Sequence, residues 1–223
     1  MILKYLDPES EYSAQERVLN TIYIGAVRRD QLLRLLSNCL KHARIDQVLQ
    51  ALRRKGWLST IYAPGKGAAI YFLSGRGLRQ IGEDGTKTAR HRVAYHIAVN
   101  DVLIRCISQF GLHGWEWHES PNDNVARRPM PSAMIHMGSE TWWIDVDDGL
   151  RLSRQMYGTC QRYKRFLRDS SRSERVLFVA PNEQRERYLR NRVAGFSGSS
   201  VRFHVCNAEQ VATYLEGSTV SIS

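Results

Sequence analysis

Apolar residues recur at helical spacing from the first residues of the chain. A helix is predicted over 13–25, with its buried face at Val18, Leu19, Ile22 and Tyr23. Ser13 and Glu16 have the spacing of a capping box at its start. A second, shorter helix is predicted over 31–36 with Asp30 as its N-cap.

A third helix and a hairpin follow. The helix is predicted over 41–55, with an apolar stripe of Ile45, Val48, Leu49 and Leu52, and it ends at Gly56, since glycine enters the left-handed conformation at little cost. Alternation over 57–62 and an apolar run over 69–73 predict two strands around a turn that carries Lys66. Three short helices and a hairpin predict a winged helix-turn-helix over residues 1–85.

Outside its apolar stripe, the third helix is polar and basic. The side chains able to pair with phosphates or with base edges are Lys41, His42, Arg44, Gln47, Gln50 and Arg54. In a winged helix, this helix enters the major groove while Lys66 on the wing reaches a phosphate or the minor groove. A solvated helix face and a protein-docking domain are the two other interpretations. We expect binding to double-stranded DNA, because Arg53 and Lys55 add further positive charge here.

Residues 86–223 alternate between helices and strands. We expect, in order, a helix over 88–110, strands over 115–119, 133–137 and 140–146, a helix over 151–167, a strand over 175–180, a helix over 183–193, a strand over 201–205 and a helix over 208–215. This αβββαβ order is the skeleton of the restriction-endonuclease-like nucleases. The predicted fold class is therefore α/β (α+β overall): an N-terminal winged helix-turn-helix followed by a restriction-endonuclease-like mixed-sheet domain.

The third strand of this second domain ends in acidic residues. Asp145 and Asp147 alternate onto one face, where two carboxylates could share Mg²⁺. Nucleases of this fold also use an acid at the start of the second strand and a lysine two residues past the third-strand acid, but Met130 and Asp147 occupy those positions.

The alternative for these acids is structural: they cap the next helix or pair with arginines. The acids concerned are Asp145, Asp147 and Asp148, and the candidate partners are Arg127, Arg128, Arg151 and Arg154. We favour a degenerate site with no cofactor and no catalysis. A metal-dependent nicking endonuclease that uses Asp145, Asp147 and Mg²⁺ is the alternative.

Charge supports a polyanionic partner. The 223 residues carry a formal net charge of +10 and a sequence pI near 9.7. Residues 151–192 hold 12 Lys and Arg against 4 Asp and Glu. Four of these cations, Arg162, Lys164, Arg165 and Arg168, crowd the end of one predicted helix, so a second phosphate-binding surface and a solvated helix face are both open.

Other classes of protein are not favoured. The four cysteines are too far apart for a short-spaced zinc motif and are expected to be reduced thiols. No apolar run reaches the roughly 20 residues of a membrane span, and the start does not have the pattern of a signal peptide. We therefore expect a cytoplasmic protein that neither binds membranes nor takes a small-molecule substrate.

Over nearly its whole length the chain resembles the replication-relaxation proteins of bacterial plasmids and integrative elements. The likeness lies in 52–58, 71–77, 91–100, Arg128-Pro129, 144–149 and Tyr163. It implies a DNA-binding protein of a mobile genetic element, acting in control of replication, transcription or transfer, with a nuclease-like second domain. That family has aspartate where this chain has Met130 and glutamate where it has Asp145. A homodimer is expected, because winged-helix regulators commonly bind two half-sites.

Overall fold

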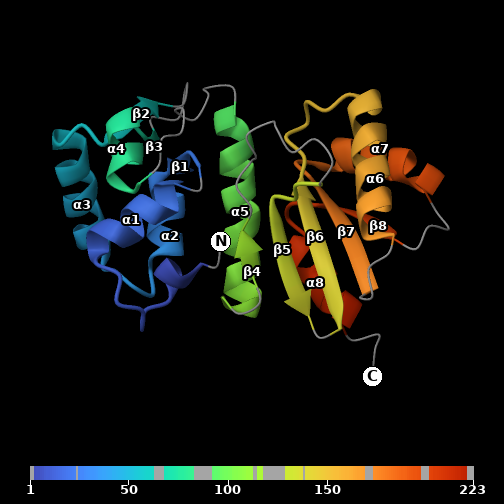
Figure 1. The fold of residues 1–223 in the computed structure, drawn as a ribbon, viewed down its shortest axis with the longest axis horizontal. Helices are drawn as coiled ribbons and strands as arrows, with labels where there is room; N and C mark the ends of the chain where they lie inside the picture. Colours follow the sequence, from blue (N-terminus) through green and yellow to red (C-terminus); the bar gives the residue numbers. More distant parts are fainter. Residues whose placement is uncertain are drawn as a thin grey trace. The chain divides into compact units, whose positions relative to one another are not determined.

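The computed structural model describes residues 3–23, 25–62, 68–82, 92–112, 115–117, 129–137, 139–168, 173–196 and 201–219. These residues form a mixed α/β structure with two sheets (Figure 1). The chain divides into two compact units, Leu3–Ile104 and Arg105–Ser223. We call them the amino-terminal and the carboxyl-terminal unit.

The amino-terminal unit combines short helices with a small antiparallel sheet. Its elements are η1 (Lys4–Leu6), α1 (Ala14–Tyr23), β1 (Val27–Arg28), α2 (Arg29–Leu35), α3 (His42–Arg54), β2 (Leu58–Tyr62), β3 (Ala69–Leu73) and α4 (Gly75–Gln80). The sheet has the order β1-β3-β2. Helices α1 and α3 start and end within two residues of their predicted bounds, and the short strand β1 was not predicted.

Local sequence determines where these helices begin and end. The capping box of α1 is present, since the Ser13 N–H donates to Glu16 Oε2 at 2.8 Å and the Glu16 N–H to Ser13 Oγ at 3.3 Å. After α3, Gly56 has φ of +70°, as expected for a left-handed helix end. The prediction that Asp30 caps α2 was wrong: α2 begins at Arg29, and the Arg28 N–H donates to Gln31 Oε1 at 3.0 Å.

Helix α5 (Val93–Phe110) contains the division between the two units, although the sequence suggested a boundary near residue 85. Its first turns are bonded to the amino-terminal unit. Gln31 Nε2 donates to the Ile97 carbonyl and to Asp101 Oδ1, both at 2.8 Å, and Asn100 Nδ2 donates to the Ala26 carbonyl at 3.1 Å. These bonds explain why residues 93–104 belong with the elements that precede them.

The carboxyl-terminal unit contains a five-stranded mixed sheet. Its other elements are β4 (Trp115–Trp117), β5 (Ala133–Met137), β6 (Glu140–Val146), α6 (Ser153–Leu167), β7 (Ser173–Ala180), α7 (Glu183–Val193), η3 (Ala194–Phe196), β8 (Arg202–Asn207) and α8 (Val211–Thr219). The sheet order is β4-β5-β6-β7-β8. Pairing is antiparallel from β4 to β6 and parallel from β6 to β8.

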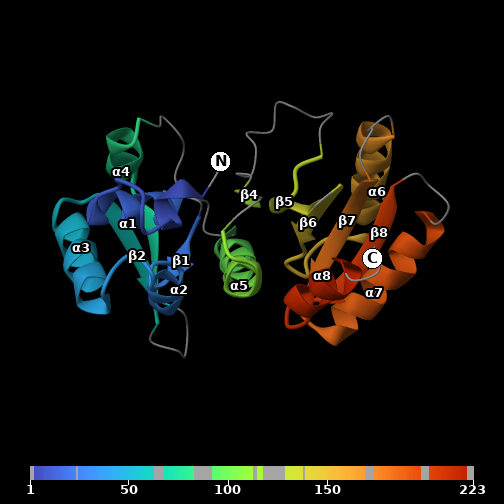
Figure 2. The same cartoon turned by 90° about the horizontal axis from the view of Figure 1, so that it is seen from below.

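Helices cover both faces of this sheet (Figure 2). Helices α6 and α7 pack on one face, over a core that includes Trp143, Met156, Tyr163, Phe178 and Leu189. On the other face, Tyr214 of α8 contacts Trp142 edge-on, with ring centroids 6.5 Å apart. Side-chain alternation along β6 therefore directs Asp145 toward the α6 side, together with Trp143.

None of the helices in the described part of the chain is long and apolar enough to cross a membrane.

Candidate nucleic-acid interface

Helix α3 is divided sharply between a buried and an exposed side. Ile45, Val48, Leu49 and Leu52 are buried, and the six residues of this helix and its N-cap that were proposed for DNA contact are all exposed. Lys41 stands at the N-cap, without a side-chain cap of its own. The sequence therefore identified correctly which side of α3 meets solvent.

The exposed residues of α3 do not all share one stripe. Arg44, Gln47, Gln50 and Arg54 lie three or four residues apart, so they follow one another along the same face. His42 belongs to the opposite flank, on the same side as Asp46, four residues on. A DNA groove that runs along the helix could therefore contact this exposed stripe of four residues, but not all six exposed residues at once.

The only acid on α3 is neutralised within the protein. Asp46 receives a bidentate pair from Arg29 of α2, at 2.9 Å from Nε and 2.6 Å from Nη2. These bonds hold the pKa of Asp46 below its ordinary value, so it stays ionised and paired. An exposed pair adds little stability. The positive charge of Arg29 cancels the repulsion between Asp46 and an approaching phosphate. The pairing of Arg29 with Asp46 was not predicted from the sequence.

Lys66 is the remaining residue proposed for DNA contact. It lies outside the described residues, between β2 and β3, and its proposed role on the wing stays a prediction.

The acidic end of β6 is a second concentration of charge, and it is buried. Asp145 is 3% exposed and Asp147 is 0% exposed. Arg151 Nη2 lies 2.7 Å from Asp145 Oδ1, and Arg185 Nε lies 2.6 Å from Asp147 Oδ2. Two carboxylates and two guanidinium groups give this cluster a formal charge of zero.

Further hydrogen bonds hold three of these side chains, those of Asp145, Asp147 and Arg185. Tyr163 of α6 donates to Asp145 Oδ2 at 3.3 Å, and the Gly149 N–H donates to Asp147 Oδ2 at 3.0 Å. Arg185 Nη2 also donates to the Arg151 carbonyl at 2.6 Å. The cluster thus joins the end of β6 to Arg151 just before α6, to Tyr163 within α6 and to the first turn of α7.

Part of this arrangement was predicted from the sequence. Arg151 was among the predicted arginine partners, whereas Arg154 is exposed, and Arg127 and Arg128 lie outside the described residues. Arg185 was missed, although one signal was available. Asn182 caps α7 through the Arg185 N–H at 2.9 Å, and this places Arg185 in the first turn after β7, the parallel neighbour of β6.

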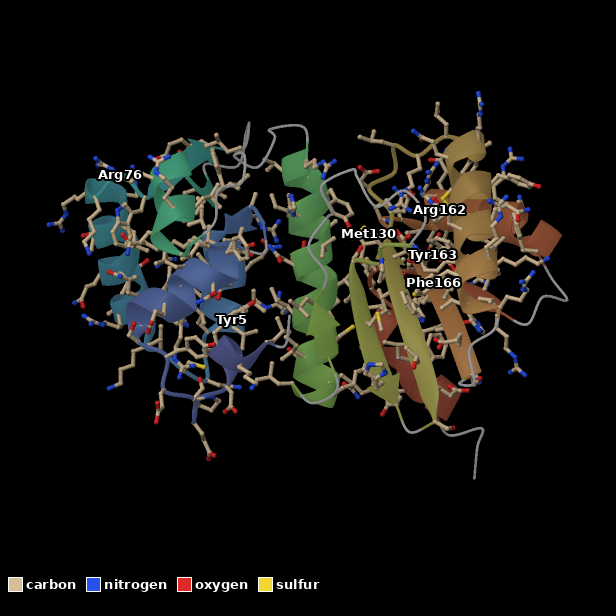
Figure 3. All side chains as sticks on the ribbon, viewed as in Figure 1. Tyr5, Arg76, Met130, Arg162, Tyr163 and Phe166 are labelled. Carbon is tan, nitrogen blue, oxygen red and sulfur yellow. The ribbon has the colours of Figure 1, made fainter. Side chains whose placement is uncertain are left out.

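Met130, which the sequence comparison aligned with the first acid of restriction-endonuclease-like nucleases, lies before β5 (Figure 3). Since Ala133 is paired with Ile144, the start of β5 and the end of β6 meet at one edge of the sheet. The topology therefore brings together the positions compared in the sequence, but only two of them hold acids. Among the described residues, no group of three or more His, Cys, Asp or Glu side chains could hold a metal ion.

The four cations proposed as a second phosphate-binding surface are exposed, three of them on α6 and Arg168 at its C-cap. They are Arg162, Lys164, Arg165 and Arg168. Figure 3 labels Arg162 near Tyr163 and Phe166 of the same helix. Tyr163 is buried against the sheet, whereas Phe166 is 43% exposed. The cysteines are free, and burial raises the pKa of Cys160, on the buried side of α6, to about 12, so its thiol is protonated at neutral pH.

Comparisons with known protein families, with curated proteins and with solved structures found no match to this chain.

Proposed function

We propose that this protein binds double-stranded DNA through the outer face of α3, with the amino-terminal unit acting as a winged helix-turn-helix. The observation that carries the proposal is the exposed stripe of Arg44, Gln47, Gln50 and Arg54, together with the neutralisation of Asp46 by Arg29. The element order and the β2-β3 hairpin support the same assignment.

The chemistry of the stripe suits a major groove. Guanidinium groups pair with phosphates or with guanine O6 and N7, and the amide of glutamine matches the N6 and N7 edge of adenine. Lys41 and Arg44 lie at the N-terminal end of α3, where recognition helices make many of their base contacts. We assign phosphate contact to Lys41, and groove contact to Arg44, Gln47 and Gln50.

Fluorescence anisotropy with labelled duplexes selected from a random pool tests this proposal. Lys41→Ala with Arg44→Ala is expected to weaken binding at least tenfold at moderate salt, because each lost contact contributes roughly 1 kcal/mol or more. Arg202→Ala, which removes an exposed cation from β8, is the control and is expected to keep wild-type affinity. Equal affinities for all three proteins would contradict the proposal.

The biological setting that we propose is a plasmid or another mobile element. The resemblance to replication-relaxation proteins supports this setting, with control of replication, transcription or transfer as the output. We further propose that the protein acts as a homodimer on two half-sites. Sedimentation of the protein with a selected duplex tests this stoichiometry, because one protomer per duplex would contradict it.

We also infer that the acidic end of β6 has a structural rather than a catalytic role. Arg151 and Arg185 already supply the positive charge that a divalent cation would bring to Asp145 and Asp147. Supercoiled plasmid incubated with the protein and Mg²⁺ or Mn²⁺ is therefore expected to stay intact. Nicking by the wild-type protein that is lost in Asp147→Asn would instead support the nuclease alternative.

A further inference from the structure

The solvent-facing side of α6 has a different chemistry from that of α3. Residues 153–168 contain no acid, and the five cations Arg154, Arg162, Lys164, Arg165 and Arg168 are all exposed. The opposite side is held in the core through Met156, Cys160, Tyr163 and Leu167. A cation-only face of this kind attracts a polyanion, and its charge is not cancelled by acids of the same helix.

Two exposed aromatic rings accompany these cations. Tyr157 is 60% exposed and Phe166 is 43% exposed. Nine residues are about two and a half turns of helix, so the two rings lie on opposite flanks of the solvent-facing side, with Arg162 and Arg165 between them. On α3, by contrast, none of the exposed side chains is an aromatic residue of the Phe, Tyr or Trp type.

Both rings are fixed from below. Tyr157 packs against Phe196 with ring centroids 5.3 Å apart, and Gln161 Nε2 donates to its hydroxyl at 3.0 Å. Phe166 meets Trp143 edge-on at 5.8 Å. A flat ligand that stacks on either ring would therefore meet a side chain that is already ordered.

Gly158 is an independent observation on the same surface. It lies in the interior of α6, where glycine destabilises a helix relative to alanine. No packing requirement explains it, because a Cβ at this position would meet no atom within 4 Å. Its neighbours at four residues on either side are Arg154 and Arg162, so the bare backbone lies within the row of cations.

We propose that this face of α6 binds single-stranded nucleic acid. The arginines contact the phosphates, Tyr157 and Phe166 stack against bases, and Gly158 lets the strand approach the helix backbone. Stacking requires the flat face of a base, which a duplex keeps inside its own stack. The proposal is independent of the function assigned to α3, since the two surfaces lie on different helices and present different chemistry.

The test is anisotropy with a fluorescein-labelled dT oligonucleotide about 20 nucleotides long, beside a duplex of equal length. Tyr157→Ala with Phe166→Ala is expected to weaken dT binding about tenfold or more and to leave duplex binding unchanged. Arg162→Ala with Arg165→Ala is expected to weaken dT binding and to lower its salt dependence. Arg202→Ala is the matched control, and Lys41→Ala with Arg44→Ala is expected to keep dT binding, so failure on α3 and failure on α6 can be told apart.

Gly158→Ala separates binding from folding. We expect it to raise the melting temperature by about 2–4 °C while weakening dT binding, because alanine favours the helix but obstructs the approach of the strand. Three results would each overturn the proposal: no binding of dT at low salt, dT binding that is indifferent to removal of both rings, or preferential binding to vesicles of anionic lipid.

Discussion

Arginine serves opposite purposes on α3 and at the acidic end of β6. On α3, Arg44 and Arg54 are exposed, and the only acid of that helix is paired with Arg29 from α2. At the end of β6, Arg151 and Arg185 are paired with carboxylates that are almost wholly buried. Formal charge counts treat both sets alike, but only exposed cations without buried acidic partners can attract DNA.

Replacing a buried, paired arginine should therefore lower the free energy of unfolding more than replacing an exposed one. Arg185→Met removes the closest guanidinium partner of the buried Asp147 and leaves only Arg151 Nε, 4.0 Å from Asp147 Oδ1. We expect this change to lower the free energy of unfolding by about 3–5 kcal/mol. Chemical denaturation followed by circular dichroism measures this loss. Arg187→Met, an exposed position on the same helix, is the control and should change stability by no more than about 0.5 kcal/mol. Similar losses in both variants would remove the distinction between buried and exposed arginines.

Buried and exposed histidines should likewise differ in how they affect the pH dependence of stability. Burial, helped by the charge of Arg92, lowers the pKa of His96 from 6.5 to about 4. Below pH 6.5 the unfolded chain takes up a proton that the folded protein accepts only near pH 4. The contribution of His96 to stability is therefore complete above pH 6.5 and is lost as the pH falls toward 4.

We expect His96→Leu to reduce the loss of stability between pH 7.5 and pH 5 by about 2 kcal/mol. Unfolding in urea at the two pH values measures this difference. His42→Leu on the flank of α3 is the control, because the side chain of His42 is exposed. An unchanged pH dependence in His96→Leu would show that this histidine titrates alike in the folded and unfolded states.

Local patterns predicted the elements of this fold well, because their determinants are close together in the chain. The buried apolar residues from Ile45 to Leu52 and the helix end at Gly56 define α3 without contributions from distant residues. The same holds for the capping box of α1, where Ser13 and Glu16 are three residues apart.

Long-range pairing was less accessible from the sequence. Arg185 is 38 residues from Asp147, and Arg28 pairs with Asp101 across 73 residues. Periodicity carries no information about which of many arginines crosses such a distance. The exposed residues of α3 could be predicted, whereas the neutralisation of Asp46 and the partner of Asp147 required the positions of neighbouring strands and helices.

The salt dependence of duplex binding tests the central claim most directly. For the wild-type protein and for Lys41→Ala with Arg44→Ala, the logarithm of the binding constant would be measured against the logarithm of salt concentration. Each lost phosphate contact should reduce the slope by about one. The double variant loses the phosphate contact assigned to Lys41, so its slope should be smaller by about one, with weaker binding at low salt. Identical slopes and affinities would contradict the assignment of α3 as the DNA-binding surface.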